Sequence, residues 1–559
     1  MNIQRLLNEA KQLYQTGNAN EAIAVLKKIL HKHPQQPIVH ANLGFIYYAQ
    51  KEFELSEYHL THSLDVVFQS ELFSLLITMY RQNQQWEKAQ LLCSKHITQI
   101  ENDAASLLNY AIILRENHHL NKCIQAYQSL LKSYPNYIES YISYGYTLNK
   151  ISRFKEAVDI YERGLQLDKK NYRLLHNIGI AYLNQYDYEK AMYHFELALA
   201  QDTGSFDLWL TLAVCQSKKR KFNEAAISIQ NAEKINPKNA LVKFQMGTLL
   251  MQQERNKEAL MWLKEVLQID PNHIEAKYHI GLIYLKLEDY KKAMDFYRYR
   301  VLRKENRLGR FNDFNVTRLD KKLKLIISRE QGIGDEVLYL SMIDEIKDHV
   351  RSLTYIVHDK LYKWVSLNFS GAEFIRESES EKYLKTNIDS VTINAASMMN
   401  YIDNWDIFFS KVKLWKVDAK IKEGYWKKYK KNDKRLMGIS WMSKNEKIGD
   451  EKSIPLEKLI PLFEGHQVIS LQYGDVEGEI EKISQESSNQ IYFDKELDYY
   501  NDINSLASLV SICDFIITCS NVTAHIAGRL GIKTFLLVPK YFGNIWYWVT
   551  EKNQSKWYP

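Results

Sequence analysis

Three short stretches in the C-terminal part of the chain combine residue types that could bind an anion and move a proton. The first is Ser328–Asp335, Ser-Arg-Glu-Gln-Gly-Ile-Gly-Asp, which follows an apolar run and precedes an amphipathic segment. Gly332 and Gly334 would let backbone amides approach a ligand, and Asp335 is placed to cap the helix that follows. The same residues could also form only a tight turn with a capping carboxylate.

A lysine in a predicted loop forms the second candidate. Lys452 lies in the stretch Asp450–Leu456, which follows the apolar run Gly438–Trp441 and leads into a helix. Its ammonium group could reach into a cleft and neutralise a phosphate as a compact charge. Most lysines in loops are simply solvated, so this alternative stays open.

The third candidate is an apolar strand that leads directly into a helix at Phe515–Gly528. The strand ends at Ser520 and Asn521, and Thr523 and His525 follow within the first turn of the helix. Free amides and the dipole at a helix start attract phosphate, and the polar side chains would add hydrogen bonds. His525 could donate to a phosphate or sugar oxygen. Simple capping of the helix with a satisfied histidine would give the same pattern.

The sequence contains no Asp-x-Asp triplet that could hold a divalent metal on a nucleotide diphosphate. We therefore expect amides, Lys452 and a helix dipole to stabilise a leaving group, with no metal and no cofactor.

Alternating strands and helices must position these stretches. Short β-rich runs alternate with amphipathic helices after residue 322, which is typical of parallel sheets. Two Rossmann-like halves, 323–432 and 433–559, would face one another across a cleft at the carboxyl ends of their strands. The predicted strands are Leu323–Arg329, Leu353–Val357, Glu373–Arg376, Ser390–Asn394, Leu436–Trp441, Gln467–Leu471, Gln490–Phe493, Phe515–Cys519 and Thr534–Val538, and the predicted helices include Leu456–Phe463 and Ile503–Ile512.

A 34-residue period fills the preceding part of the chain. Small residues recur at this spacing at Ala111, Gly145, Gly179, Ala213, Gly247 and Gly281, and a second small residue follows each by twelve positions. This is the tetratricopeptide signature, in which small residues let paired helices cross closely. We expect an α-helical superhelix of about nine repeats within residues 1–307, followed by a linker at 308–322.

The position two residues before each small residue should face the concave groove of the repeats. It reads Asn8, Asn42, Leu75, Asn109, Ser143, Asn177, Thr211, Gln245 and His279. A polar row of this kind could hydrogen-bond the backbone of an extended peptide, although asparagine is common at this position in any tetratricopeptide protein.

Composition excludes several other classes of protein. A net charge of +7 is small for 559 residues and forms no basic stripe, so we expect no nucleic-acid partner. No run of 18 apolar residues predicts a membrane span, and the N-terminus does not resemble a signal peptide. Five scattered cysteines fit a reduced cytoplasm.

Together the motifs resemble the TPR-linked glycosyltransferases of bacteria, whose catalytic half is similar to the heptosyltransferase (family 9) branch of the GT-B fold. The strings that carry this resemblance are REQGIGDEVLYL, GISW with EKSIPLEKLIPLF, VISLQYG, DINSLASLVSICDFIITCSNVTAHIAGRLGIKTFLLVP and NIWYWVTEKNQSKWYP. The polar row resembles the asparagine ladder of the eukaryotic O-GlcNAc transferase.

The resemblance implies metal-independent, inverting transfer of a sugar from a nucleotide donor that the C-terminal half holds. It implies that Asp335 is the general base, that Lys452 binds phosphate and that Ser520 to His525 form the phosphate-binding turn. Many relatives have Asp-Thr where this chain has Ser520-Asn521, which leaves the donor nucleotide and sugar open.

The acceptor that the resemblance implies is a protein hydroxyl, for example on flagellin or another secreted protein. Two alternatives stay open: a non-catalytic scaffold with a degenerate transferase half, and a transferase acting on a glycolipid. Relatives often continue for a short segment beyond Tyr558-Pro559, so the sequence also leaves open whether the chain ends there naturally.

Overall fold

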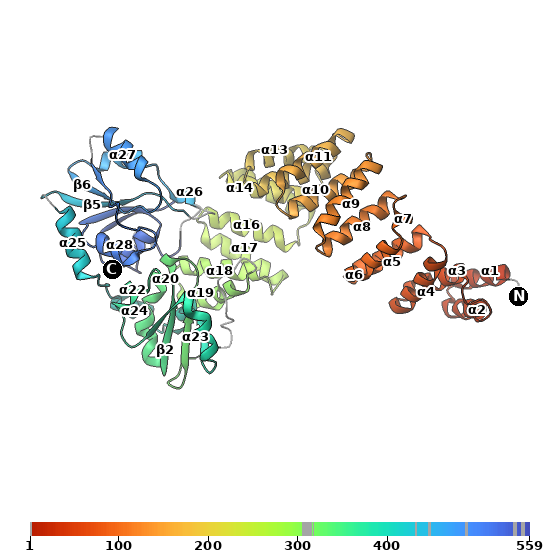
Figure 1. Ribbon diagram of the computed structural model, residues 1–559, viewed down its shortest axis with the longest axis horizontal. Helices are drawn as coiled ribbons and strands as arrows, with labels where there is room; N and C mark the ends of the chain where they lie inside the picture. Colours follow the sequence, from red (N-terminus) through yellow and green to blue (C-terminus); the bar gives the residue numbers. More distant parts are fainter. Residues whose placement is uncertain are drawn as a thin grey trace. The chain divides into compact units, whose positions relative to one another are not determined.

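The computed structural model of the protein describes residues 3–303, 316, 318–430, 433–444, 449–486, 490–539, 545–548 and 554–558 (Figure 1). The chain divides into two compact units, Met1–Ile235 and Asn236–Pro559. The predicted boundary between the repeats and the linker lies outside the described residues. The C-terminal unit contains both β-sheets and the last two pairs of repeat helices.

The 34-residue period is confirmed as nine pairs of helices within the described residues. The N-terminal unit contains α1 Ile3–Gln15, α2 Ala19–Lys32, α3 Pro37–Ala49, α4 Phe53–Val66, α5 Ser70–Gln82, α6 Trp86–Lys95, the short α7 Ile97–Ile100, α8 Ala104–Glu116, α9 Leu120–Ser133, α10 Ile138–Lys150, α11 Phe154–Leu167, α12 Tyr172–Asn184, α13 Tyr188–Leu199, α14 Phe206–Lys218 and α15 Phe222–Ile235. The C-terminal unit begins with α16 Ala240–Gln252, α17 Asn256–Ile269, α18 Ile274–Lys286, α19 Tyr290–Tyr297 and the 3-10 helix η1 Arg298–Leu302.

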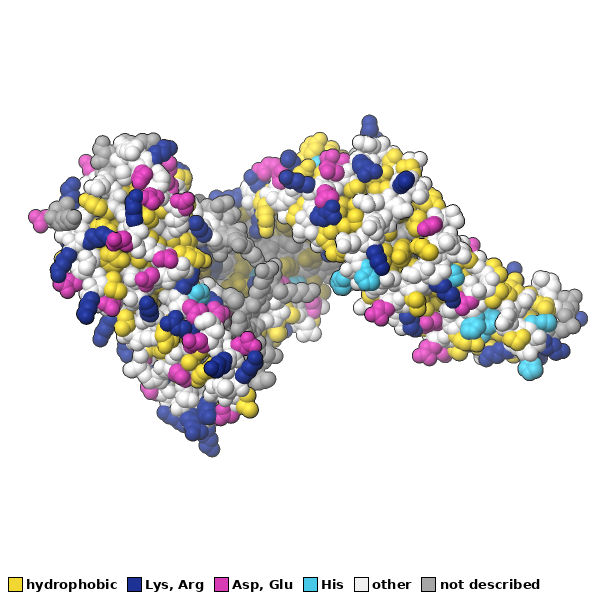
Figure 2. Space-filling view, in the orientation of Figure 1, with side chains coloured by type: hydrophobic (Ala, Val, Ile, Leu, Met, Phe, Trp, Pro, Cys, Tyr) yellow, Lys and Arg dark blue, Asp and Glu magenta, His cyan; other side chains and the backbone are white. Residues whose placement is uncertain are grey.

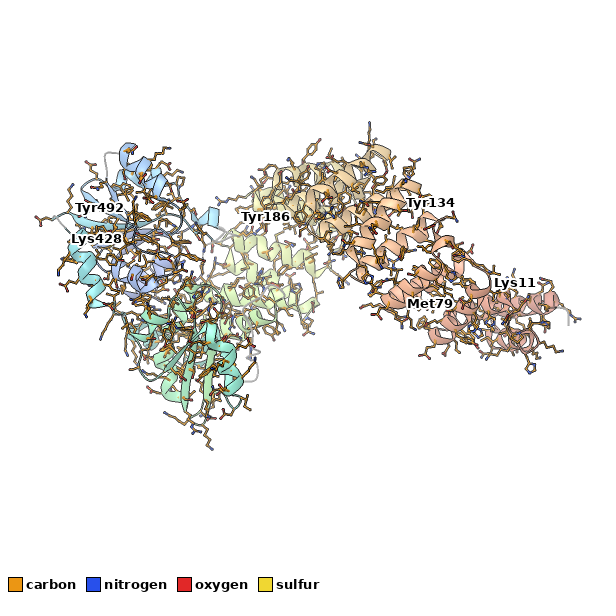
Figure 3. The ribbon with its side chains drawn as sticks, in the orientation of Figure 1. Lys11, Met79, Tyr134, Tyr186, Lys428 and Tyr492 are labelled. Atoms are coloured by element: carbon orange, nitrogen blue, oxygen red, sulfur yellow. The ribbon has the colours of Figure 1, made fainter. Side chains whose placement is uncertain are left out.

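Turns within the repeats place one residue in the left-handed region of backbone conformation. Tyr186, labelled in Figure 3, has a φ of 62° between α12 and α13. Residues at the same place in other repeats share this conformation, namely Lys51, Gln84, His118, Ser152, Arg220, Glu254 and Glu288. The first repeat has Gly17 at this place, with a φ of 89°, whereas the other eight repeats place a residue with a side chain there and bear the cost of the left-handed conformation.

The small residues allow the close crossing that the period predicts. A Cβ atom added at Gly179 would lie 2.4 Å from the Phe195 ring, which the next helix contributes. Gly281 is less tolerant of substitution, because its added Cβ would lie 2.6 Å from a backbone atom, the nitrogen of Tyr297. A ring can turn away from such a contact, whereas a backbone atom moves only with its helix.

Two parallel sheets follow the repeats. The first has the order β3-β2-β1-β4, and the second has the order β7-β6-β5-β8-β9. Their strands are β1 Lys324–Ser328, β2 Ser352–Val357, β3 Glu373–Arg376, β4 Val391–Asn394, β5 Arg435–Ser440, β6 His466–Ser470, β7 Ile491–Tyr492, β8 Phe515–Cys519 and β9 Thr534–Leu537. All nine predicted strands occur, with ends that differ by at most two residues.

Helices connect the strands and cover the sheets (Figure 1). They are α20 Ile333–Leu340, α21 Ile343–Ile346, η3 Lys347–His349, α22 Tyr362–Ser366, η4 Glu377–Glu379, α23 Ser380–Thr386, η5 Ala395–Tyr401, α24 Trp405–Lys411, α25 Ala419–Tyr429, α26 Gly449–Lys452, η6 Leu456–Leu462, α27 Glu477–Glu486, α28 Ile503–Val510 and α29 Val522–Arg529. The amphipathic helix predicted at Leu456–Phe463 is wrong in type. It is a 3-10 helix, because Pro461 has no N–H to donate and its ring obstructs an α-helical turn.

The lysine-rich helix α25 packs on the second sheet. It contacts α28, and the Tyr429 hydroxyl donates a 2.9 Å hydrogen bond to buried Asp494. Lys428, labelled in Figure 3, also pairs with Asp494 at 3.1 Å, and the Tyr429 ring centroid lies 6.0 Å from that of Tyr492 of β7. At least one lysine of this stretch, Lys428, is therefore engaged in contacts that hold α25 against the rest of the unit, and the stretch does not form a basic binding stripe.

On the face in Figure 2, acidic and basic side chains are mixed across the part of the chain that carries the sheets.

The described helices include none that is both long and apolar enough to cross a membrane.

We predict that Gly281→Ala destabilises the C-terminal unit by about 1–3 kcal/mol, because the new methyl group would meet the backbone of Tyr297 and force α18 and α19 apart. The matched control is Gly424→Ala on α25, where an added Cβ has no neighbour within 4 Å. That control should gain about 0.5–1 kcal/mol from its higher helix propensity. Denaturant unfolding of both variants measures the difference. Equal stability of the two would show that α18 and α19 tolerate a wider spacing.

Candidate functional site

A cleft of about 310 Å³ lies at the carboxyl ends of strands from both sheets. Every residue predicted for catalysis or donor binding lines this cleft except Thr523. The lining residues are Gly332, Ile333, Gly334, Asp335, Ser443, Lys444, Lys452, Tyr473, Tyr499, Tyr500, Ile503, Ser520, Asn521, Val522, His525, Ile545 and Tyr547. The cleft therefore combines the turn after β1 with segments that follow each of the five strands of the second sheet, β5 to β9.

The turn after β1 is built around Gln331, a non-glycine residue with a φ of 64°. Three contacts hold it in this unfavourable conformation. Its side-chain amide donates to the Tyr297 hydroxyl at 3.0 Å and accepts from the Tyr339 hydroxyl at 3.1 Å. The Arg329 guanidinium donates to its carbonyl at 3.1 Å. Since Tyr297 ends the last repeat helix, a repeat side chain shapes this turn.

A buried ion pair fixes the same turn from the other side. The Arg300 guanidinium contacts both carboxylate oxygens of Glu330, at 2.6 and 2.9 Å, and donates to the Ser397 hydroxyl at 2.7 Å. Arg300 is 4% exposed and Glu330 is 1% exposed. The amide of Ala396 also donates to Glu330 at 3.1 Å. Sequence reasoning missed this pair, because the two residues share no motif and lie 30 positions apart.

Asp335 lies within the first turn of α20, and its predicted role as the N-cap is wrong. Gly332 is the N-cap, because its extended backbone (φ −84°, ψ 169°) lets the helix begin at Ile333. The Asp335 carboxylate still accepts a 3.2 Å hydrogen bond from the Gly332 amide. The Tyr547 hydroxyl donates to its other oxygen at 2.8 Å.

Burial raises the pKa of the Asp335 carboxyl above its usual range. The hydrogen bonds from Tyr547 and Gly332 and the charge of Lys452 act in the opposite direction. A carboxylate whose pKa is raised accepts a proton more readily, so Asp335 is well suited to act as a general base.

Lys452 is buried, although the sequence predicted that it lies in a loop. It ends the helical turn α26 and is 8% exposed. Burial lowers the pKa of its ammonium group, and the charge of Asp335 opposes that shift. No described residue forms a hydrogen bond or an ion pair with the ammonium. A buried cation at the edge of a cleft stabilises a bound anion strongly, because little water screens it.

Asn521 caps α29 and links the start of this helix to the end of β5 in the second sheet. Its side-chain oxygen accepts from the Thr523 amide at 3.0 Å, and its side-chain nitrogen donates to the Ser440 hydroxyl at 2.7 Å. The Asn521 side chain therefore already has hydrogen-bond partners within the protein, and it positions the start of the helix next to the end of β5.

Thr523 is fully buried outside the cleft. Ser520 accepts a 2.8 Å hydrogen bond from the Trp548 indole.

His525 lies in an aromatic box. Its ring centroid lies 5.4 Å from that of Tyr547, 4.5 Å from that of Trp548 and 5.7 Å from that of Tyr558. Nδ1 shares a hydrogen bond with the Tyr558 hydroxyl. Burial, with smaller contributions from Arg529 and Lys452, lowers the pKa of the imidazole well below its usual value, so the ring is neutral at physiological pH.

Gly334 allows the histidine to approach the turn after β1. A Cβ atom at position 334 would lie 2.6 Å from His525 Nε2. Gly334, which the sequence predicted to let a ligand approach the backbone, therefore leaves room for the His525 imidazole.

The four asparagines of the predicted acceptor groove lie on the first helices of their pairs. Asn8 is exposed on α1, while Asn42, Asn109 and Asn177 are half-buried on α3, α8 and α12. Asn109 accepts a 2.8 Å hydrogen bond from Arg81, and Asn8 accepts one of 3.3 Å from Gln4. Their amides are thus at or near the surface of the N-terminal unit.

Sequence reasoning also missed the tyrosines of the cleft. Tyr473, Tyr499, Tyr500 and Tyr547 line it, but no motif distinguishes them among the 37 tyrosines of the chain. Tyr473 and Tyr547 lie in two of the strings that carry the resemblance, VISLQYG and NIWYWVTEKNQSKWYP, which is the only signal in the sequence that pointed to them. Among the described residues, no three His, Cys, Asp or Glu side chains form a group that could hold a metal ion.

Comparison with known proteins identifies the repeats. Tetratricopeptide repeat models match residues 6–35, 105–137, 138–171 and 250–298. Protein FlbA of Caulobacter vibrioides is 26% identical over 243 residues, which cover 38% of this chain and 39% of that protein. The human protein O-mannosyl-transferase TMTC3 is 26% identical over 168 residues, 29% of this chain and 18% of that protein, mainly in the repeats. The chain thus spans about two fifths or less of the length of these relatives.

Solved structures resemble parts of the chain. A tetratricopeptide repeat protein from Parabacteroides merdae is 16% identical, with a TM-score of 0.35, and covers 50% of this chain and 98% of its own. YrrB, described as a TPR protein with an unusual peptide-binding site, is 24% identical, with a TM-score of 0.27, and covers 32% of this chain and 92% of its own. The matches to the tetratricopeptide repeat models, together with the nine helix pairs, identify this chain as a protein that contains tetratricopeptide repeats, and such repeats typically bind protein partners.

We predict that Arg300→Met destabilises the C-terminal unit by about 3–5 kcal/mol, because it leaves the Glu330 carboxylate buried without an opposite charge. Adding Glu330→Gln should recover part of this loss. The control is Lys385→Gln, which removes the exposed pair with Glu381 and should cost less than about 1 kcal/mol. Urea unfolding measures all three variants. If Arg300→Met costs no more than the control, the ion pair does not hold the turn.

Proposed function

We propose that the protein is a glycosyltransferase that moves a sugar from a nucleotide-sugar donor to a Ser or Thr hydroxyl of a protein acceptor. One observation carries this proposal. A carboxylate suited to accept a proton, a buried lysine without a partner among the described residues, and the start of α29 line the same cleft at the carboxyl ends of two parallel sheets.

The donor would bind mainly to the half of the cleft that the second sheet contributes. We propose that the segments 323–432 and 433–559 form a GT-B-like pair of Rossmann-like domains, which the four-stranded and five-stranded parallel sheets support. The diphosphate would lie between the Lys452 ammonium and the amides at the start of α29, where charge and dipole both favour an anion. Lys452 could replace a metal in this role, and the chemistry that we propose needs none.

The transfer would be an inverting displacement. Asp335 accepts the proton of an acceptor hydroxyl while that oxygen attacks the anomeric carbon from the face opposite the diphosphate. The bond between the anomeric carbon and the phosphate oxygen breaks, and the nucleoside diphosphate leaves with the electron pair. Lys452, the α29 amides and the neutral His525 imidazole would stabilise the negative charge that develops on the leaving oxygen.

The repeats would hold the acceptor. The asparagines of α1, α3, α8 and α12 offer amides to the backbone of an extended chain, which supports binding with little demand on sequence. The name of TMTC3 describes transfer to protein hydroxyls, and we propose the same class of acceptor here. Flagellin or another secreted protein, glycosylated in the cytoplasm before export, would fit such a groove.

We predict that one of UDP, GDP, ADP or CMP, or one of their sugar conjugates, raises the unfolding temperature of the protein. Saturation at about 100 times the dissociation constant adds roughly 2.7 kcal/mol. Lys452→Ala should abolish the shift, whereas the control Lys385→Ala on α23 should retain it. Asp335→Asn should still bind the nucleotide but transfer no labelled sugar to a protein acceptor.

A protein that no nucleotide stabilises would contradict the proposal and favour a scaffold whose transferase half is inactive. Transfer to a glycolipid that survives removal of the repeats would identify a lipid acceptor.

A further inference from the structure

The C-terminal segment of the chain is described in two stretches, 545–548 and 554–558; Ile545 and Tyr547 of the first line the cleft, and Tyr558 of the second contacts His525 of its lining. The Ser555 hydroxyl donates a 2.6 Å hydrogen bond to the Tyr547 carbonyl and so holds the stretches together. Neither stretch belongs to a sheet or to a helix. The position of the segment is therefore set by the contacts that its side chains make with the rest of the protein.

Each stretch contacts a residue to which the proposed function gives a chemical role. The Tyr547 hydroxyl donates to Asp335 Oδ1 at 2.8 Å, and the Tyr558 hydroxyl bonds to His525 Nδ1. Asp335 follows the first sheet, and His525 follows the second. One short segment therefore contacts both halves of the cleft.

The far side of the segment is anchored on the last repeat and on α24. Trp557 is 1% exposed, and its ring packs against Tyr290 of α19 and against Trp405, Phe408 and Phe409 of α24. Beside it, Lys556 forms an ion pair with Glu288 in the turn before α19. This burial of aromatic surface supplies the free energy that keeps the segment in place.

The Tyr558 ring also lies against α29. A Cβ atom at Gly528 would lie 2.5 Å from that ring, so the glycine allows the ring to lie on the helix. The Arg529 guanidinium lies 4.8 Å from the ring centroid. Tyr558 is thereby fixed with its hydroxyl at His525.

We infer that Tyr547 and Tyr558 are positioning residues of the proposed transfer site: Tyr547 orients the Asp335 carboxylate and stabilises its ionised form, and Tyr558 selects the tautomer of His525. This inference rests on the proposed function for the roles of Asp335 and His525. The contacts themselves belong to the protein without substrate.

Both tyrosines remain hydrogen-bond donors at physiological pH, because burial raises the pKa of each phenol. A phenol that donates to Asp335 favours the carboxylate over the carboxylic acid, and its loss makes that group easier to protonate. A phenol that donates to His525 Nδ1 leaves the ring proton on Nε2. That nitrogen lies next to Gly334 at the cleft, where it can donate to a leaving oxygen.

The test is a carboxyl carbon NMR titration of the full-length protein labelled at aspartate. Asp335→Asn assigns the signal by its disappearance. In Tyr547→Phe, the midpoint of the Asp335 titration should move to higher pH, because the variant loses only the hydroxyl that stabilises the ionised form. The matched control is Tyr500→Phe, which removes a hydroxyl from the same cleft without touching Asp335, and its midpoint should equal that of the wild type.

Tyr558→Phe tests the second contact. Nitrogen chemical shifts of labelled histidine should show His525 with its proton on Nε2 in the wild type. The variant should lose this preference while its Asp335 midpoint stays unchanged. If Tyr547→Phe does not fold, Ser555→Ala loosens the same stretch and should shift the Asp335 midpoint in the same direction.

Turnover provides a separate measurement. With the donor that the unfolding scan identifies, the acidic limb of the kcat profile should move to higher pH in Tyr547→Phe, with activity recovering in alkaline buffer. An unchanged Asp335 midpoint in folded Tyr547→Phe overturns the positioning role, whatever the turnover. A shifted midpoint in a protein that turns over no donor supports the positioning role and counts against the proposed function instead.

Discussion

A buried ion pair between Arg300 and Glu330 joins the end of the repeats to the turn that carries the carboxylate of the cleft. Burying two charges is costly, and the geometry compensates with two hydrogen bonds between them and further ones from neighbouring groups. Beside this pair, Tyr297 stabilises the left-handed Gln331. The position of Asp335 therefore depends on the last repeat as well as on the first sheet. The last two repeats and the sheets accordingly belong to one compact unit.

Burial shifts the pKa values of three side chains in the cleft. Removal from water raises the proton affinity of Asp335, lowers that of Lys452 and keeps His525 neutral. Asp335 and Lys452 each stabilise the charged form of the other, so each partly offsets the pKa shift that burial causes in its neighbour. In the proposed function, Asp335 is the base, Lys452 the cation and His525 a neutral donor within one site. The C-terminal segment supplies two phenols, one bonded to Asp335 and one to His525, which we propose as positioning groups.

Local patterns in the sequence predicted most of the fold. The repeats were predictable because close helix crossings demand small residues every 34 positions, and strands such as Glu373–Arg376 and Phe515–Cys519 were predictable from their apolar runs. Residues at the ends of those strands were predictable as site candidates, since parallel strands place them at one edge. Arg300, Gln331 and Tyr547 were not predictable, because their roles come from contacts between distant segments. The helix type predicted at Leu456–Phe463 was wrong for a local reason, an internal proline, and Thr523, predicted to bind the donor, is buried outside the cleft.

A crystal structure of the protein with the nucleotide that stabilises it would show where the donor binds. We predict that the diphosphate lies within hydrogen-bond distance of the Lys452 ammonium and of the amides at the start of α29. The Asp335 carboxylate would then face the position of the anomeric carbon from the opposite side. A nucleotide bound elsewhere on the chain, or a diphosphate that contacts neither Lys452 nor α29, would contradict sugar transfer in this cleft.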